Sequence, residues 1–180
     1  MAELEARLQA FEREALAHLD SLLRTAGRVA GSGLDAEDIV QETFLRAWRY
    51  FDSFEAGTNC RAWLFQIMFN VIKGRRRDLV SRPETSFEDE MDDAFQPGNV
   101  IVFDPTRRIE GSEVLKATGL LSEEHRAVLF LIAVEEFTYR EAAEILGVPV
   151  GTVMSRLHRA RHELRRLLTP NRSGARVSNQ

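Results

Sequence analysis

The sequence predicts an all-α protein with two small helical domains. Apolar residues recur at helical spacing in several long stretches, and no sustained alternation of apolar and polar residues indicates a strand. Hydrophobic residues make up 44% of the 180-residue chain, which is enough to form helical cores. A segment rich in proline, glycine and acidic residues, 81–111, lies between the helical regions and predicts their division into two domains.

The first domain, residues 1–80, is predicted to contain three helices. They cover residues 3–30, 34–51 and 61–79. Gly31 and Gly33 end the first helix, because glycine tolerates the backbone conformations that a helix cannot continue. A loop that contains Gly57 separates the second helix from the third. The third helix ends in a cluster of basic residues, Lys73, Arg75, Arg76 and Arg77.

Two segments are predicted to be flexible. Residues 81–111 carry three prolines and an acidic cluster between Glu84 and Asp93, a composition that cannot bury enough apolar surface to fold. This segment is also long for a connection within one domain, so it is predicted to be a linker. Residues 170–180 are predicted to form a disordered tail.

The second domain, residues 112–169, carries the start and stop signals of a helix-turn-helix. Ser122 followed by two glutamates indicates a helix start. Thr138 and Glu141 have the spacing of a capping box, so the next helix begins there. Gly147 suits the left-handed residue that ends a helix, and Pro149 suits the first position of the one that follows. A tight glycine turn before a basic helix is typical of DNA-binding motifs.

The last helix has two contrasting faces. Its apolar face is predicted to pack on a core and consists of Val153, Leu157, Ala160, Leu164 and Leu168. The opposite face carries hydroxyl and guanidinium groups, which suit phosphates and base edges, from Thr152, Ser155, Arg156 and Arg159. An ordinary helical hairpin with a solvated arginine face is the alternative.

Composition excludes several classes of protein. The formal net charge is −4, so nucleic acid would be bound by local basic faces rather than by the whole chain. One cysteine, Cys60, excludes an internal disulfide, and it is interpreted as a small half-buried residue rather than a redox switch. No signal peptide, membrane span, catalytic set, cofactor site or metal site is apparent, so we expect a cytoplasmic protein that is not an enzyme.

Two further groups of residues suggest binding surfaces. Asp38, Gln41, Glu42 and Leu45 share one helix face, which suits a basic protein surface, although periodicity alone favours a solvated face. The segment from Gly57 onward combines aromatic, amide and basic residues, which suit unstacked bases and their backbone. The alternative is that its aromatic residues belong to the core.

Three segments follow one another along the chain: the acidic helix face, the segment from Gly57 onward and the helix-turn-helix. In this order they resemble a bacterial RNA polymerase sigma factor of the extracytoplasmic-function group of the sigma-70 family. The likeness extends over residues 8–168 and rests on Asp-Ala-Glu-Asp-Ile-Val-Gln-Glu-Thr-Phe, Gly-Thr-Asn-Cys-Arg-Ala-Trp and Gly-Thr-Val-Met-Ser-Arg. It implies two domains, σ2 and σ4, that bind core RNA polymerase and direct transcription from promoters by reading their −10 and −35 elements.

The resemblance also implies partners and site residues. The partners would be the β′ coiled coil and the β flap of RNA polymerase, promoter DNA, and a small anti-sigma factor, often a zinc-binding one. The polymerase contacts would be Asp35, Asp38, Gln41, Glu42 and Leu45. The −10 contacts would be Thr58, Asn59, Arg61, Trp63, Asn70, Lys73 and Arg76. The −35 contacts would be Tyr139, Thr152, Met154, Ser155, Arg156, His158 and Arg159.

Two other functions remain open at the level of sequence. A free-standing helix-turn-helix regulator would bind a two-fold symmetric operator without polymerase, using residues 1–80 for dimerisation or sensing. A sigma-like decoy would bind an anti-sigma factor but not DNA. The decoy should lack the groove-facing arginines, which this chain has at Arg156 and Arg159.

Overall fold

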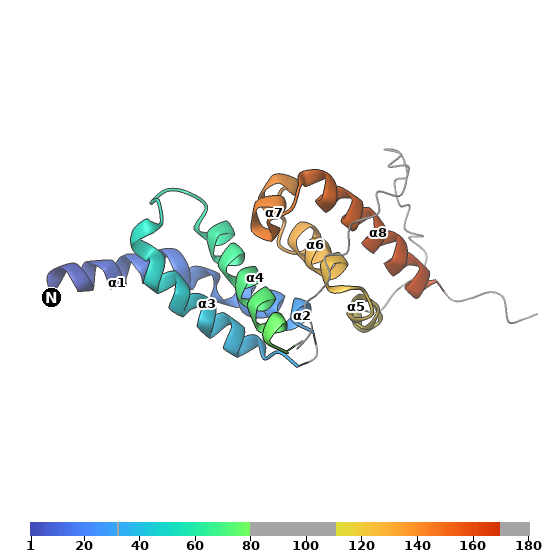
Figure 1. Cartoon of the computed structure of the whole chain (residues 1–180), viewed down its shortest axis with the longest axis horizontal. Helices are drawn as coiled ribbons and strands as arrows, with labels where there is room; N and C mark the ends of the chain where they lie inside the picture. The colour runs from blue at the N-terminus through green and yellow to red at the C-terminus, as the bar shows by residue number, and fades with distance from the viewer. Residues whose placement is uncertain (32, 80–110, 170–180) are drawn as a thin grey trace, which may run out of the picture.

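A computed structural model describes residues 1–31, 33–79 and 111–169, and every regular element in this part of the chain is helical (Figure 1). The first domain contains α1 (Ala2–Ala15), the 3-10 turn η1 (Leu16–His18), α2 (Leu19–Val29), α3 (Ala36–Tyr50), the 3-10 turn η2 (Phe51–Ser53) and α4 (Cys60–Leu79). The second domain contains α5 (Gly111–Gly119), α6 (Glu123–Ala133), α7 (Tyr139–Leu146) and α8 (Val150–Leu168). The predicted all-α class is confirmed. The predicted linker lies outside the described residues except for Gly111, and the predicted tail lies wholly outside them.

The first domain is a bundle in which α3 packs between α2 and α4. Asp35 starts α3 by accepting hydrogen bonds from the backbone amides of Glu37 (2.7 Å) and Asp38 (3.2 Å), as an N-cap residue does. The ring of Phe11, on α1, packs edge-on against three aromatic rings, those of Phe44, Trp48 and Phe51. This aromatic cluster attaches α1 to the C-terminal half of α3.

The helix predicted over residues 3–30 is wrong in one respect, because η1 interrupts it. The buried residues Phe11, Ala15 and Leu22 keep the same helical spacing across the interruption, so their pattern gives no sign of it. At the junction the Ser21 hydroxyl donates to the His18 carbonyl oxygen at 3.0 Å. A serine that bonds back to the preceding turn commonly bends a helix, and this contact lies where α2 begins.

The second domain confirms most of the predicted helix signals. The Ser122 hydroxyl accepts from the His125 amide, and Thr138 and Glu141 form the predicted capping box. Gly147 ends α7 with φ 68°, in the left-handed region that favours glycine. Pro149 differs by one position from the prediction, because it is the N-cap of α8 rather than its first residue. Local hydrogen bonding therefore sets these helix ends.

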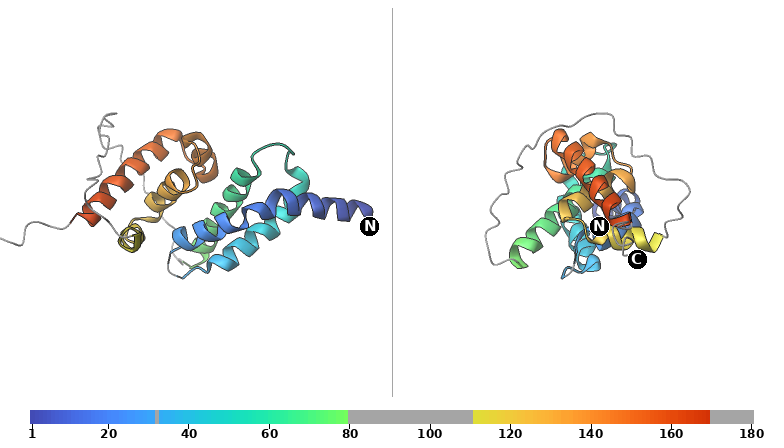
Figure 2. Two further views of the ribbon diagram at one scale, coloured as in Figure 1. Left: turned by 180° about the vertical axis from the view of Figure 1, so that it is seen from behind. Right: turned by 90° about the vertical axis from the view of Figure 1, so that its right-hand side faces the viewer.

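The two domains pack against each other through α4 with α7 and α2 with α6. Figures 1 and 2 show the two groups of helices side by side from the front and from behind. The rings of Phe65, on α4, and Phe137, before α7, lie edge-on with their centroids 5.0 Å apart. Buried residues of both domains form one continuous apolar cluster. The arrangement of the domains, which the sequence leaves open, is therefore closed in this structure.

Candidate nucleic-acid interface

The acidic face of α3 is largely open to solvent. Asp38, Gln41 and Leu45 are exposed, and Leu45 is exposed to 61%, which is high for a large apolar side chain. Asp35 is also exposed, although its carboxylate already caps the helix. The combination of an uncovered leucine with acidic and amide groups is suited to contact with a protein surface.

Glu42 differs from its neighbours on this face because it is held by two arginines. Arg75, from α4, places Nη2 2.9 Å and Nε 3.0 Å from Glu42 Oε2, and Arg46 places Nη2 2.5 Å from Oε1. The hydrogen bonds from Arg75, and less strongly those from Arg46, lower the pKa of Glu42 despite an opposing effect of desolvation. Arg75 also donates to the Asp38 carbonyl oxygen (3.2 Å), so it links α4 to this face.

Asn59 and Thr58 lie just before α4, on the loop that the sequence assigns to the −10 element. The Thr58 hydroxyl donates to the Glu55 carbonyl oxygen at 2.7 Å. Asn59 Oδ1 accepts from the Ala62 amide at 3.0 Å, which satisfies one of the free amides at the start of the helix. Its Nδ2 donates to Glu141 Oε1 of the second domain at 2.8 Å.

Arg61 lies in the interface between the domains rather than on an open surface. Its guanidinium forms an ion pair with the Glu135 carboxylate, and Nη1 donates to the Glu135 carbonyl oxygen at 2.8 Å. The same group lies over the ring of Phe137, 4.4 Å from its centroid, and 5.4 Å from that of Phe65. In the closed arrangement, Glu135 therefore pairs with the charge of Arg61, and Phe137 covers the flat face of its guanidinium.

The remaining predicted −10 residues lie along α4 and differ in exposure. Asn70 and Lys73 are exposed, whereas Trp63 is partly covered and its ring centroid lies 5.0 Å from that of Phe54. Arg76 forms an ion pair with Glu123 of α6 and donates to the Ala30 carbonyl oxygen at 3.0 Å. Phe65 is fully buried, as the core alternative for the aromatic residues anticipated.

Sequence reasoning missed two residues that organise this region. Glu135 has a relative exposure of 2% and forms ion pairs with Arg61 and Arg24. Arg75 joins α4 to the acidic face of α3. The sequence around Glu135, Val-Glu-Glu-Phe, contains two adjacent acids with nothing to distinguish the buried one. No local signal identifies either role, because both depend on distant helices.

The α8 face predicted to contact the −35 element is only partly uncovered. His158 and Arg159 are exposed, and so is Tyr139 at the start of α7. The Ser155 hydroxyl donates to the Thr152 carbonyl oxygen at 3.1 Å. Residues of intermediate exposure are Thr152, Met154, Ser155 and Arg156. The predicted apolar face is confirmed as the packed one, since its first three members are buried.

Arg156 is less exposed than expected for a side chain that contacts bases in the major groove. Its side chain is 15% exposed, and Nη2 lies 3.1 Å from Glu124 Oε1 on α6.

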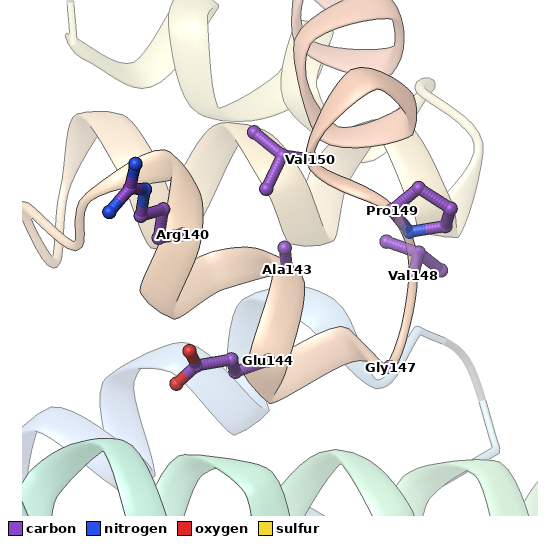
Figure 3. A pocket seen from close by; sticks show the side chains of 7 residues that line it. All are labelled: Arg140, Ala143, Glu144, Gly147, Val148, Pro149 and Val150. Carbon is purple, nitrogen blue, oxygen red and sulfur yellow. The ribbon is translucent and has the colours of Figure 1, made fainter.

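A shallow hollow of about 550 Å³ lies at the turn between α7 and α8 (Figure 3). Its lining consists of Arg140, Ala143, Glu144, Gly147, Val148, Pro149 and Val150. A basic and an acidic side chain at this mouth make it poorly suited to a purely anionic ligand.

Cys60 lies at the first position of α4 and is buried. Burial raises the pKa of its thiol to about 11, with a smaller contribution from the charge of Glu14. The thiol is therefore protonated at neutral pH and a poor nucleophile, consistent with a structural role.

In the described part of the chain, none of the helices is both long and apolar enough to traverse a bilayer.

Two sigma-70 family models match the chain on either side of the predicted linker. Sigma-70 region 2 matches residues 15–82, and Sigma-70, region 4 matches residues 112–164. The first match covers the helices from η1 to α4, without most of α1, and the second covers α5 to α7 and most of α8. The fold, the exposed acidic face of α3 and the helix-turn-helix of α7 and α8 therefore define a two-domain sigma-type protein.

Known proteins narrow this class. The ECF RNA polymerase sigma factor EcfG of Rhodopseudomonas palustris is 37% identical over 156 residues, which cover 85% of this chain and 82% of that protein. The sigma factor RpoE, solved with the anti-sigma factor NepR from Bartonella quintana, superposes with a TM-score of 0.70 and 33% identity, covering 91% of this chain and 99% of that one. CnrH, solved with the cytosolic domain of CnrY, gives 0.61 and 27%, covering 89% and 88%.

The chain belongs to the extracytoplasmic-function RNA polymerase sigma factors, which direct promoter-specific transcription and are not enzymes as a family. The family predicted from the sequence is thereby confirmed. The comparisons do not test the individual contact residues, which remain predictions.

Proposed function

We propose that this sigma factor binds core RNA polymerase through the acidic face of α3, with the β′ coiled coil as its partner there. The observation that supports this role is the uncovered apolar side chain of Leu45 among the exposed polar residues Asp38 and Gln41. An exposed leucine rimmed by polar groups is typical of a protein contact. Arg75 and Arg46 hold Glu42 in place at the edge of this face.

The two promoter elements would be read by different domains. The start of α4, with Asn59 and Arg61, would contact the −10 element, and the exposed side of α8, with His158 and Arg159, would enter the −35 major groove. Two weak contacts on one tether gain affinity through effective concentration when the promoter spacing fits the protein. The β flap would hold the second domain on the enzyme.

Transcription by purified components tests this function. Core RNA polymerase, with and without the protein, is supplied with a library of promoter fragments from the host genome, and the transcript starts are sequenced. Shared sequence elements upstream of protein-dependent starts are the expected result. The absence of protein-dependent starts would contradict the proposal, and tight binding of duplex DNA without polymerase would instead favour a free-standing regulator.

Variants of the α3 face separate polymerase binding from fold stability. Leu45→Ala and Gln41→Ala alter exposed side chains, so the fold should be retained while affinity for core polymerase falls. Glu37→Ala is a matched control because Glu37 is also exposed on α3 but outside the predicted contact set. Polymerase affinity that is equal in all three variants would remove this face from the interface.

We also propose that an anti-sigma factor controls this protein. The support is that the solved relative RpoE is described in complex with the anti-sigma factor NepR, and CnrH in complex with the cytosolic domain of a second protein, CnrY. Affinity purification from host cells, followed by identification of the bound proteins and their metal content, tests for such a partner and for zinc in it. Recovery of polymerase subunits alone, under inducing and non-inducing conditions, would contradict this part of the proposal.

A further inference from the structure

Three of the predicted −10 residues are engaged by glutamates of the second domain. Asn59 donates to Glu141 at 2.8 Å, and Arg61 is paired with Glu135. The third pair joins Arg76 to Glu123. The three glutamates come from the start of α6, the turn after it and the first turn of α7. The second domain thus presents a set of carboxylates to the groups that would bind a nucleic-acid strand.

Glu135 is the central residue of this set, and its side chain reaches from the second domain to partners in the first. Its Oε1 accepts from the Thr25 hydroxyl at 2.9 Å and lies 3.5 Å from Arg24 Nε, while Arg61 contacts the other oxygen and the backbone carbonyl. A buried carboxylate is costly unless hydrogen bonds and opposite charge surround it. All the partners named for this side chain belong to the first domain, so separating the domains would remove them together.

The turn after α6 is shaped to direct this side chain inward. Glu136 has φ 57°, and the amides of Glu135 and Phe137 donate back to the Phe130 (2.9 Å) and Leu131 (3.0 Å) carbonyl oxygens. Glu135 is buried as a result, whereas the next residue, Glu136, is exposed. Two adjacent acids therefore have opposite environments, and the second provides a matched control for the first.

Glu135 uses two donors of the Arg61 guanidinium that could otherwise bind a phosphate: Nη2 contacts its carboxylate and Nη1 its backbone carbonyl oxygen. Arginine binds carboxylate and phosphate through the same kind of charge-assisted hydrogen bond. The ring of Phe137 covers the flat face of Arg61 (4.4 Å), the surface on which a base would otherwise stack. Arg61 cannot hold Glu135 and Phe137 while it holds a DNA strand in the same geometry.

We propose that the second domain is an internal competitor for nucleic acid, in which Glu123, Glu135 and Glu141 substitute for DNA at the −10 face and keep it closed until the domains separate. The consequence for DNA rests on the function proposed above, whereas the closed contact itself does not. The device is contained in one chain and needs no second protein to mask the face.

Glu135→Gln tests the central contact and keeps the shape of the side chain. Dyes on Glu12→Cys and His162→Cys, in a Cys60→Ala background, report the distance between α1 and α8 by energy transfer; binding of a labelled single-stranded DNA of mixed sequence is measured in parallel. Loss of the charged contact should shift the equilibrium towards the open form by about tenfold and lower the apparent Kd for DNA by a similar factor while the closed form predominates.

Glu136→Gln removes the same charge from an exposed position and should change neither measurement appreciably. This control separates opening from the general effect of reduced negative charge on DNA binding. Equal energy transfer and equal DNA affinity in wild type and Glu135→Gln would overturn the proposal. Equal gains in Glu135→Gln and Glu136→Gln would overturn it as well, since charge alone would then explain them.

A cross-link tests the proposal even if Glu135→Gln fails to fold. Gln66 Nε2 lies 3.4 Å from the Glu144 carbonyl oxygen across the interface, and both residues are exposed. Gln66→Cys and Glu144→Cys, in the Cys60→Ala background, can be joined by a cleavable bismaleimide. The linked protein should lose DNA binding and promoter-dependent transcription, and cleavage should restore both.

Undiminished DNA binding by the linked protein would overturn the proposal. If instead linkage abolishes DNA binding and cleavage restores it, but no promoter-dependent product appears in either state, the closed contact stands and the proposed sigma function fails. The two hypotheses are therefore separated by these measurements.

Discussion

Phe137→Ala should destabilise the first domain although the substituted residue belongs to the second. Phe137 is 5% exposed, and its ring contacts the ring of Phe65 and the guanidinium of Arg61 across the interface. If these contacts stabilise both domains, their loss will lower the free energy of unfolding of each domain. If the domains fold independently, only the second will respond.

The magnitude follows from the contacts that cross the interface. An edge-on aromatic pair contributes about 0.5–1.5 kcal/mol beyond simple burial, and a cation–π contact contributes about 0.5–1 kcal/mol. Their sum predicts that the first domain loses about 1–2.5 kcal/mol of its free energy of unfolding. Truncation of a buried phenylalanine to alanine costs about 3–5 kcal/mol in total, and the remainder falls on the second domain.

The two tryptophans of the chain make this measurement selective. Trp48 and Trp63 both lie in the first domain, so their fluorescence during thermal unfolding reports that domain alone. Circular dichroism reports the helices of both domains. In thermal unfolding, 1 kcal/mol corresponds to about 4–8 °C for a domain of this size. The tryptophan transition of Phe137→Ala should therefore move by several degrees or more.

Val153→Ala is the control for this prediction. Val153 is fully buried on α8, which packs against α5, α6 and α7, so its truncation weakens the second domain without removing a ring from the interface. A tryptophan transition of Phe137→Ala that coincides with the wild-type curve, while circular dichroism shows loss of the second domain, would refute the coupling.

Three further predictions concern single residues. Gly147→Ala should cost about 1–2 kcal/mol by urea denaturation, because its φ of 68° is unfavourable for a side chain, whereas Gly151→Ala within α8 should stabilise by about 0.5–1 kcal/mol. The lowered pKa of Glu42 means that its ionised form stabilises the fold above its ordinary pKa of 4.5 and that this contribution is lost as the pH falls through the lower folded value. Glu42→Gln should thus weaken the acid dependence of stability, measured by urea titrations across that range; an unchanged pH profile would contradict this. Native Cys60 should react slowly with an aromatic disulfide reagent at neutral pH and quickly in urea, as followed by absorbance, because burial raises the pKa of its thiol to about 11.

Helix ends were predictable where a few neighbouring residues determine them. Thr138 and Glu141 form a capping box, and Gly147 adopts the left-handed conformation, both as the sequence predicts. Each of these features involves hydrogen bonds or dihedral angles within a few residues. The interruption at η1 was not predictable, because the apolar spacing continues through it.

The candidate surfaces were predictable only as groups of residues on a helix face. The helical period correctly places Asp38, Gln41 and Leu45 together on the open face of α3. The same reasoning placed Arg156 with the exposed groups of α8, whereas the structure covers much of its side chain and pairs it with Glu124. A period describes the direction of a side chain, but exposure depends on what packs beside it.

The sequence by itself determined most of the helices, the capping of α6 and α7, and the family to which the chain belongs, because these depend on local hydrogen bonding and on motifs of adjacent residues. Only the tertiary structure decided that the domains pack against each other and that Glu135, not Glu136, forms the ion pair with Arg61. The physical reason is that the favourable environment of a buried charge comes from residues far apart in the chain, here Thr25 and Arg61.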